Sequence, residues 1–161
     1  MRLKSITRLA ILTSAMMLTM SALAQNPKHC KPAGGMLLTN LGAVDQATTM
    51  GYATGDLKGA VGATIKTLNF VGDKVVLTVQ HHWVTEFGDT LAFDPAQVTA
   101  QHVGDSNSLR YGITDYTVSL TGGTGKFDGA TGKFDVLGEV DLGSGQLVMR
   151  YNGYICFPNN F

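Results

Sequence analysis

The feature that most limits how this chain can fold is a glycine-rich stretch, residues 120–140, which contains the pentapeptide TGKFD twice. The copies start at Thr124 and Thr131, seven residues apart. Side chains alternate along a strand with a period of two, so this odd offset would place Phe127 and Phe134 on opposite faces of one straight strand. Glycine permits a break, because it adopts positive φ without a Cβ clash. We therefore expect a strand ending near residue 120, a turn, a short plug carrying Phe127, a second turn, and a strand over residues 133–142.

The glycines in this stretch do not form a phosphate-binding loop. A P-loop requires Gly-Lys followed by Ser or Thr, because that hydroxyl holds magnesium, but here Phe127 follows Gly125-Lys126. The dinucleotide fingerprint also fails, since Asp128 occupies the place of its third glycine. The stretch is therefore predicted to be structural, with turns between strands. Its expected turn residues are Gly122, Gly123, Gly125, Gly129 and Gly132.

The segment GGTGKFDGATGKF resembles the turn that marks the allene oxide cyclase and dirigent group of barrels, GGTG-x-F-x-G-A-x-G. The matching residues are Gly122, Gly123, Thr124, Gly125, Phe127, Gly129, Ala130 and Gly132. A weaker match, GDLKGAVGATI at residues 55–65, is similar to an early strand pair of bacterial, exported members. The resemblance implies a calycin-like, eight-stranded antiparallel closed β-barrel with an apolar lumen. Members of the group include cyclases, proteins that steer the stereochemistry of coupling, and many proteins with no assigned activity.

The rest of the chain independently predicts an all-β domain, because short alternating runs recur between turn signals and no convincing amphipathic helix appears. Twenty glycines suit the turns and bends of a small closed barrel. An outer-membrane barrel is the alternative, since the sequence ends in Phe161, but Pro158 interrupts the last strand and the aromatic residues form no two girdles. Strands are expected over residues 36–44, 48–54, 58–68, 73–87, 90–93, 97–103, 110–120, 133–142 and 146–157.

The N-terminal residues have the pattern of a secretory signal peptide over residues 1–24. Arg2, Lys4 and Arg8 precede a largely apolar run, and Ala22-Leu23-Ala24 provides a small-x-small cleavage site. Cleavage leaves 137 residues, with an extended segment at 25–35 and a single barrel domain at 36–161. The mature chain has nine basic and twelve acidic residues, a net charge of −3, which argues against binding to nucleic acid or anionic lipid. We expect a periplasmic or extracellular protein with no membrane span in the mature chain.

The two cysteines are predicted to form a disulfide. Cys30 and Cys156 are the only pair in a chain expected to reach an oxidising compartment, and such pairs are usually bridged, with Cα atoms about 4.4–6.8 Å apart. Free thiols or metal ligands are the alternative. A bridge would join the start of the mature chain to the last strand.

Residues 73–87 show the clearest alternation of apolar and polar side chains. One face of this strand is mostly apolar, and His81 and Trp83 lie on it. This face is expected to meet the lumen, where an indole and an imidazole offer a small apolar molecule a stacking surface and one titratable group. Complete filling of the barrel by side chains is the alternative. The lumen candidates are His81, Trp83, Phe87, Tyr116, Phe134, Met149 and Tyr151.

Neither a metal site nor a catalytic centre follows from the pattern. His81 and His82 alternate to opposite faces, and His82 and Glu86 are about 13 Å apart along a strand, so only a third group such as His102 from another strand would complete a zinc site. Acids with the right chemistry, if buried, are Glu86, Asp89, Asp115 and Glu139, of which Glu139 is expected to face water. No cofactor is predicted, and the oligomeric state is open. Two functions fit: a barrel that binds a small apolar ligand, with a cyclase-like or stereochemistry-directing role as its more specific form, and a non-enzymatic module with a filled barrel.

Overall fold

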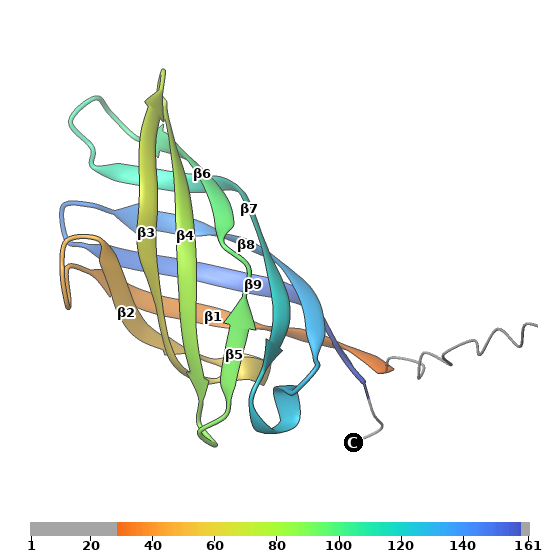
Figure 1. Ribbon diagram of the computed structural model, residues 1–161. Helices are drawn as coiled ribbons and strands as arrows, with labels where there is room; N and C mark the ends of the chain where they lie inside the picture. Colours follow the sequence, from red (N-terminus) through yellow and green to blue (C-terminus); the bar gives the residue numbers. More distant parts are fainter. Residues whose placement is uncertain (1–28, 159–161) are drawn as a thin grey trace, which may run out of the picture.

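The computed structural model describes residues 29–158, so the expected signal peptide at 1–24 lies outside the described residues. Within them the chain is a closed antiparallel β-barrel, shown in Figure 1. The strands are β1 (His29–Leu41), β2 (Thr48–Ala53), β3 (Gly59–Val71), β4 (Lys74–Thr85), β5 (Thr90–Phe93), β6 (Ala96–Val103), β7 (Arg110–Gly123), β8 (Thr131–Asp141) and β9 (Gln146–Phe157).

The nine strands occupy eight positions around the barrel. β5 and β6 both lie between β4 and β7 and together fill one position, interrupted at Asp94-Pro95, where proline lacks the N–H that a continuous strand would need. Pairing of β3 with β4 and of β1 with β9 leaves the ring closed. The prediction of an all-β, eight-stranded closed barrel is confirmed. No helix among residues 29–158 is long and apolar enough to cross a membrane.

The first strand starts earlier than the sequence predicted. Residues 29–35 were expected to precede the barrel, yet β1 begins at His29 and pairs with β9 from His29↔Phe157 onwards. Pro32 is tolerated because β2 pairs only with Leu37–Leu41, which leaves the side of β1 away from β9 without a strand partner there. The predicted Cys30–Cys156 disulfide is present between residues directly opposite each other, with a Cα–Cα distance of 3.8 Å, shorter than expected.

Two short 3₁₀ turns close one end of the barrel, and they share a sequence pattern. η1 (Gly55–Leu57) lies within TGDLKG and η2 (Gly125–Phe127) lies within TGKFDG. In each, the glycine has positive φ, 81° and 56°, and the threonine before it accepts a backbone hydrogen bond at Oγ1. Each turn directs one apolar side chain inward, so Leu57 and Phe127 are almost fully buried. The expected plug at Phe127 is confirmed.

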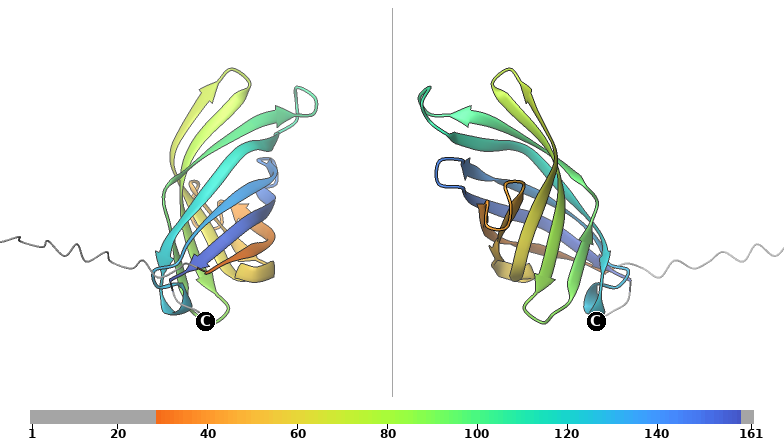
Figure 2. Two further views of the ribbon diagram at one scale, coloured as in Figure 1. Left: turned by 90° about the vertical axis from the view of Figure 1, so that its right-hand side faces the viewer. Right: turned by 60° about the vertical axis from the view of Figure 1, so that its left-hand side comes forward.

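The two ends of the barrel differ, as the views in Figure 2 show. The closed end has η1, η2 and the β4–β5 turn, together with the start of β1 and the end of β9. The opposite end, which we call the open end, has the β1–β2, β3–β4, β6–β7 and β8–β9 connections. Inward side chains from every strand position form the core between them. Its larger members are Leu37, Val61, Val79, Trp83, Leu91, Phe93, Val98, Tyr116, Val118, Leu120, Phe134, Val136, Met149, Tyr151 and Ile155.

Candidate ligand-binding lumen

The lumen has two halves that meet at Tyr116 of β7. The half towards the closed end is packed with aromatic side chains and retains a void of only about 20 Å³. His81, Trp83 and Phe93 enter it from β4 and β5, and Phe134 and Tyr151 enter it from β8 and β9. Five ring pairs among these residues and Tyr116 have centroids 5.4–5.9 Å apart, the spacing of favourable aromatic contacts. This half is protein core rather than ligand space.

Hydrogen bonds tie this aromatic core to the closed end. The indole Nε1 of Trp83 donates to the carbonyl of Leu57 at 2.8 Å. The phenol of Tyr151 donates to the carbonyl of Thr54 at 2.8 Å and accepts from the amide of Leu57 at 3.1 Å. Both side chains therefore satisfy the buried amide and carbonyl of Leu57 in η1, which would otherwise have no partner there, and Tyr151 also binds the carbonyl of the preceding Thr54. This explains why an apolar lumen has polar aromatic residues at these positions.

His81 and Tyr116 form the one hydrogen-bonded pair of titratable side chains among the residues lining the two halves. The imidazole Nε2 contacts the phenol oxygen, and the two rings stack with a 22° interplanar angle. Burial, with a smaller contribution from the charge of His82, lowers the pKa of His81 to about 4. Burial also raises the pKa of Tyr116. Both side chains are therefore uncharged at neutral pH.

The remaining nitrogen of His81, Nδ1, is buried and has no partner among the described residues. A buried N–H without an acceptor is costlier than a bare lone pair, so the proton is favoured on Nε2, which then donates to the phenol oxygen of Tyr116. In that arrangement the phenol hydrogen of Tyr116 remains available to a second acceptor. The pair can thus offer one hydrogen bond from an otherwise apolar wall.

The other half of the lumen contains an apolar cavity of about 290 Å³ that opens between the connections of the open end. Tyr116, Val79, Val98 and Met149 lie at its inner end. The rest of its wall is aliphatic or aromatic except for Gln46 and Thr49, and it has no charged side chain. The additional lining residues are Leu41, Ala63, Ile65, Leu68, Phe70, Val75, Leu77, Ala100, Tyr111, Ile113, Val140, Leu142 and Leu147.

Six of the seven lumen candidates face the interior. His81, Trp83, Phe134 and Tyr151 line the packed half, Met149 lines the open cavity, and Tyr116 borders both. The expected inward face of β4 is correct, since Val75, Val79 and Trp83 are buried while His82 is exposed. Whether any of these residues contacts a ligand stays a prediction.

The placement of Phe87 in the lumen was wrong. Its side chain is 76% exposed, because β4 ends at Thr85 and the chain turns through Gly88, whose φ is 87°. Alternation predicts the direction of a side chain only while the backbone stays extended. Phe87 instead lies outside the closed end, with Lys126 Nζ 5.3 Å from its ring centroid.

Several lining residues were missed for a definable reason. Lys66 forms a bulge in β3, so Ile65 pairs with Val79 and Thr67 with Thr78. Because of the extra residue, the side chains that point inward are at odd positions before the bulge and at even positions after it. Leu68 and Phe70 therefore join Ile65 in the cavity wall. The apolar spacing at 61, 63, 65, 68 and 70 was the available signal, because it changes phase once.

The acids considered as catalytic groups lie outside the lumen. Glu86 pairs with Lys58 at 2.9 Å, and Glu139, exposed as expected, lies 3.7 Å from Arg110. Asp115 is exposed, and neither half of the lumen is lined by Asp89 or by any other acid. Between residues 29 and 158 there is no group of three or more His, Cys, Asp or Glu placed to hold a metal ion. Chemistry in the lumen would depend on His81 and the tyrosines.

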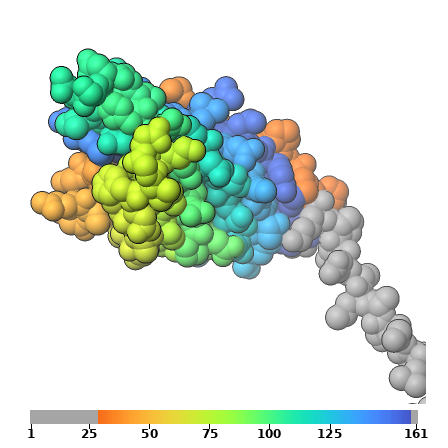
Figure 3. All heavy atoms as spheres, turned by 90° about the horizontal axis from the view of Figure 1, so that it is seen from above, coloured from red at the N-terminus to blue at the C-terminus, as the bar shows by residue number. Residues whose placement is uncertain are grey.

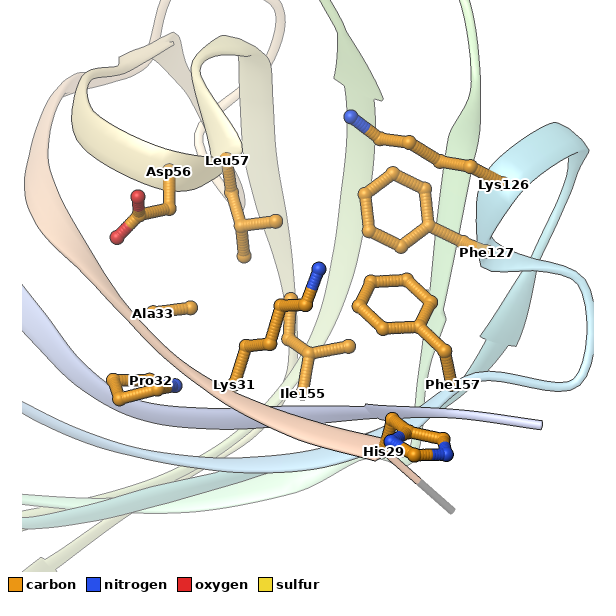
Figure 4. A pocket seen from close by; sticks show the side chains of 10 residues that line it. All are labelled: His29, Lys31, Pro32, Ala33, Asp56, Leu57, Lys126, Phe127, Ile155 and Phe157. Carbon is orange, nitrogen blue, oxygen red and sulfur yellow. The ribbon is translucent and has the colours of Figure 1, made fainter. Parts of the chain in front are cut away.

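A second depression, about 430 Å³, lies at the closed end between η1, η2 and the ends of β1 and β9. Figure 4 shows Phe127 and Phe157 side by side in it, with Asp56 across from them and Lys31 and Lys126 nearby. The Phe127 and Phe157 ring centroids are 6.0 Å apart, and Lys126 Nζ lies 5.0 Å from that of Phe127. The depression is more open and more polar than the lumen cavity, so it is the weaker candidate for an apolar ligand.

Comparison with known proteins leaves the family open. No family model and no curated protein matches the sequence. Among solved structures, the chain is similar to that of a pterocarpan synthase dirigent protein, at 15% identity and a TM-score of 0.36, with 92% of this chain and 99% of that chain covered. At these values the likeness assigns neither an activity nor a ligand. The sites described above therefore rest on the barrel's own geometry.

Proposed function

We propose that this protein is an exported barrel that binds a small apolar molecule in the open half of its lumen. The observation that carries the proposal is the cavity of about 290 Å³ with an uncharged, almost wholly apolar wall. An engineered apolar cavity of about 150 Å³ binds benzene, so this larger volume suits a molecule of about two or three rings. Burial of apolar surface would provide the driving force.

Tyr116 adds a preference within that class. Its phenol borders the cavity and is held by His81, so a ligand with one acceptor oxygen near its inner end gains a hydrogen bond that a pure hydrocarbon lacks. A stereochemistry-directing or cyclase-like role is the finer proposal, in which fixed side chains hold a reactive ligand in one orientation. The filled, non-enzymatic barrel is the second candidate, and the packed aromatic half favours it.

Paired substitutions on β9 distinguish the two candidates. Leu147 lines the cavity, whereas its neighbour Val148 points outward and is 46% exposed. Titration of N-phenyl-1-naphthylamine should show saturable fluorescence enhancement with the parent protein. We expect Leu147→Trp to fill the cavity and weaken the affinity at least about tenfold, and Val148→Trp to leave it unchanged. No saturable binding by the parent, or equal loss in both variants, would favour the filled barrel.

Export is the second part of the proposal. A disulfide between Cys30 and Cys156 supports it, because such bonds persist mainly in oxidising compartments. Expression of the full chain in a bacterial host should yield a periplasmic or secreted protein whose intact mass corresponds to a start at Gln25 and two fewer hydrogens than the reduced form. A protein that retains Met1 and stays in the cytoplasm would contradict this part alone.

A further inference from the structure

Exposed apolar side chains gather at the open end of the barrel. Each of its four connections has at least one within it or in the strand beside it, and we call this set the open-end rim: Val44, Leu68, Phe70, Val71, Leu109 and Leu142. Their exposed fractions range from 46% to 72%. In Figure 3 the β1–β2 and β6–β7 connections project on the side away from the start of β1, and the β3–β4 connection faces the viewer. Among the connections of the closed end, only the β4–β5 turn exposes a large apolar side chain, Phe87, and the strand residues near these connections that do so are Tyr52, Val84 and Tyr154.

The rim is continuous with the cavity. Leu68, Phe70 and Leu142 are exposed at the surface and also line the cavity wall. Val44, Val71 and Leu109 lie beyond them and line no part of it. An apolar molecule entering or leaving the lumen therefore passes a surface that is itself apolar. Grouped exposed apolar residues of this kind mark a docking surface rather than ordinary scatter.

The charge around the rim excludes an anionic surface as the natural partner. Each connection has an aspartate at or beside it, Asp45, Asp73, Asp105 and Asp141. The positive charges at or beside these connections are Lys74, next to Asp73, and Arg110, which lies 3.7 and 3.9 Å from Glu139 and Asp141. The acids outnumber them, so the rim has no surplus of positive charge. A lipid surface without net charge meets the apolar tips without this electrostatic cost.

The shape of the rim also favours lipid over a second copy of the chain. The four connections that carry or adjoin the rim residues stand at different places around the open end in Figure 2, and the cavity opens between them. Two copies meeting end to end would set hollow against hollow and bury little apolar area, whereas acyl chains can fill the spaces between the tips. The described chain begins and ends at the closed end, opposite the rim.

We propose that the open-end rim docks on a zwitterionic lipid surface, so that the apolar ligand passes between that surface and the lumen. This inference rests on the proposed ligand-binding function but concerns different residues. The rim variant that tests it is Val71→Ser/Leu109→Ser, because neither residue lines the cavity. The matched control is Val84→Ser/Phe87→Ser, which removes two exposed apolar side chains nearer the closed end.

Flotation with phosphatidylcholine vesicles should recover the parent protein and the control variant equally, and the rim variant at least about tenfold less, with little dependence on salt. Binding of N-phenyl-1-naphthylamine in solution should be equal in all three, which separates failure of docking from failure of ligand binding. The proposal is overturned if the parent does not float, if it floats only with phosphatidylglycerol present, or if both variants lose binding equally. It is also overturned if sedimentation shows a dimer that the rim variant abolishes.

Discussion

Acidification should destabilise this protein through His81. The folded barrel lowers the pKa of this imidazole from 6.5 to about 4, mainly because burial disfavours the charged form and secondarily because of His82. The rings that contact it are those of Phe93 and Tyr116, and neither carries a negative charge that could compensate the imidazolium. Between these two pKa values the unfolded chain binds a proton that the folded chain does not.

The free energy of unfolding should therefore fall as the pH drops from about 6.5 towards about 4. It should be fully retained above the unfolded pKa, because both states are then neutral. For the values of 6.5 and about 4, the linkage relation predicts a loss of about 2.5 kcal/mol at about pH 4.5 relative to pH 7.5. This is a large share of the stability of a small domain.

Urea unfolding followed by far-ultraviolet circular dichroism would measure this at both pH values. His81→Gln keeps a polar group near Tyr116 but cannot titrate, so its two free energies should differ by about 2.5 kcal/mol less than those of the parent. His82→Gln is the matched control at an exposed position. It should remove only the smaller of the two contributions that lower the pKa of His81, so most of the pH dependence of the parent should remain. A parent and a His81→Gln variant with the same pH dependence would refute the assignment of a buried, neutral imidazole.

Two stability predictions concern other parts of the barrel. Trp83→Ala should lower the free energy of unfolding by about 3–5 kcal/mol, because it opens a cavity in the packed half and leaves the Leu57 carbonyl without its donor. Val84→Ala, on the outer face, should lower it far less. Equal losses in urea unfolding would contradict the packing of this half. Gly123→Ala should lower the free energy of unfolding by more than about 1 kcal/mol, because the new Cβ would lie 2.1 Å from the Thr90 carbonyl oxygen. Gly112→Ala should be tolerated, because the nearest atom there is Val103 Cγ1 at 3.4 Å. Equal melting temperatures for the two variants would argue against a structural role for the glycine turn.

The sequence by itself determined the class of the fold and which face of its most regularly alternating strand is buried. Alternation along residues 73–85 requires one apolar face to be buried, and that is the face on which His81 and Trp83 lie. The glycine-rich stretch required a break in the strand between Phe127 and Phe134. The structure has that break, and both phenylalanine side chains are buried, one before it and one after it. The cysteine pair followed from its count and the expected export.

The tertiary structure decided how the lumen is divided between packed core and open cavity. Six of seven predicted candidates face inward, but which of them meets empty space depends on the summed volumes of side chains from all eight positions, and no local pattern contains that sum. The bulge at Lys66 is a second feature that the tertiary structure decided. One extra residue there changes which alternate side chains of β3 point into the barrel.

The repeated pentapeptide shows, within one chain, how sequence and tertiary structure each contribute to the conformation of a segment. TGKFD forms a 3₁₀ turn at its first copy and part of β8 at its second. At the first copy Gly125 has a φ of 56°, and Thr124 Oγ1 accepts the amide of Thr90, which ends the strand pairing. At the second copy β7 and β9 pair with the chain on both sides and keep it extended. Five identical residues permit both conformations, and the hydrogen-bonding partners available at each place choose between them.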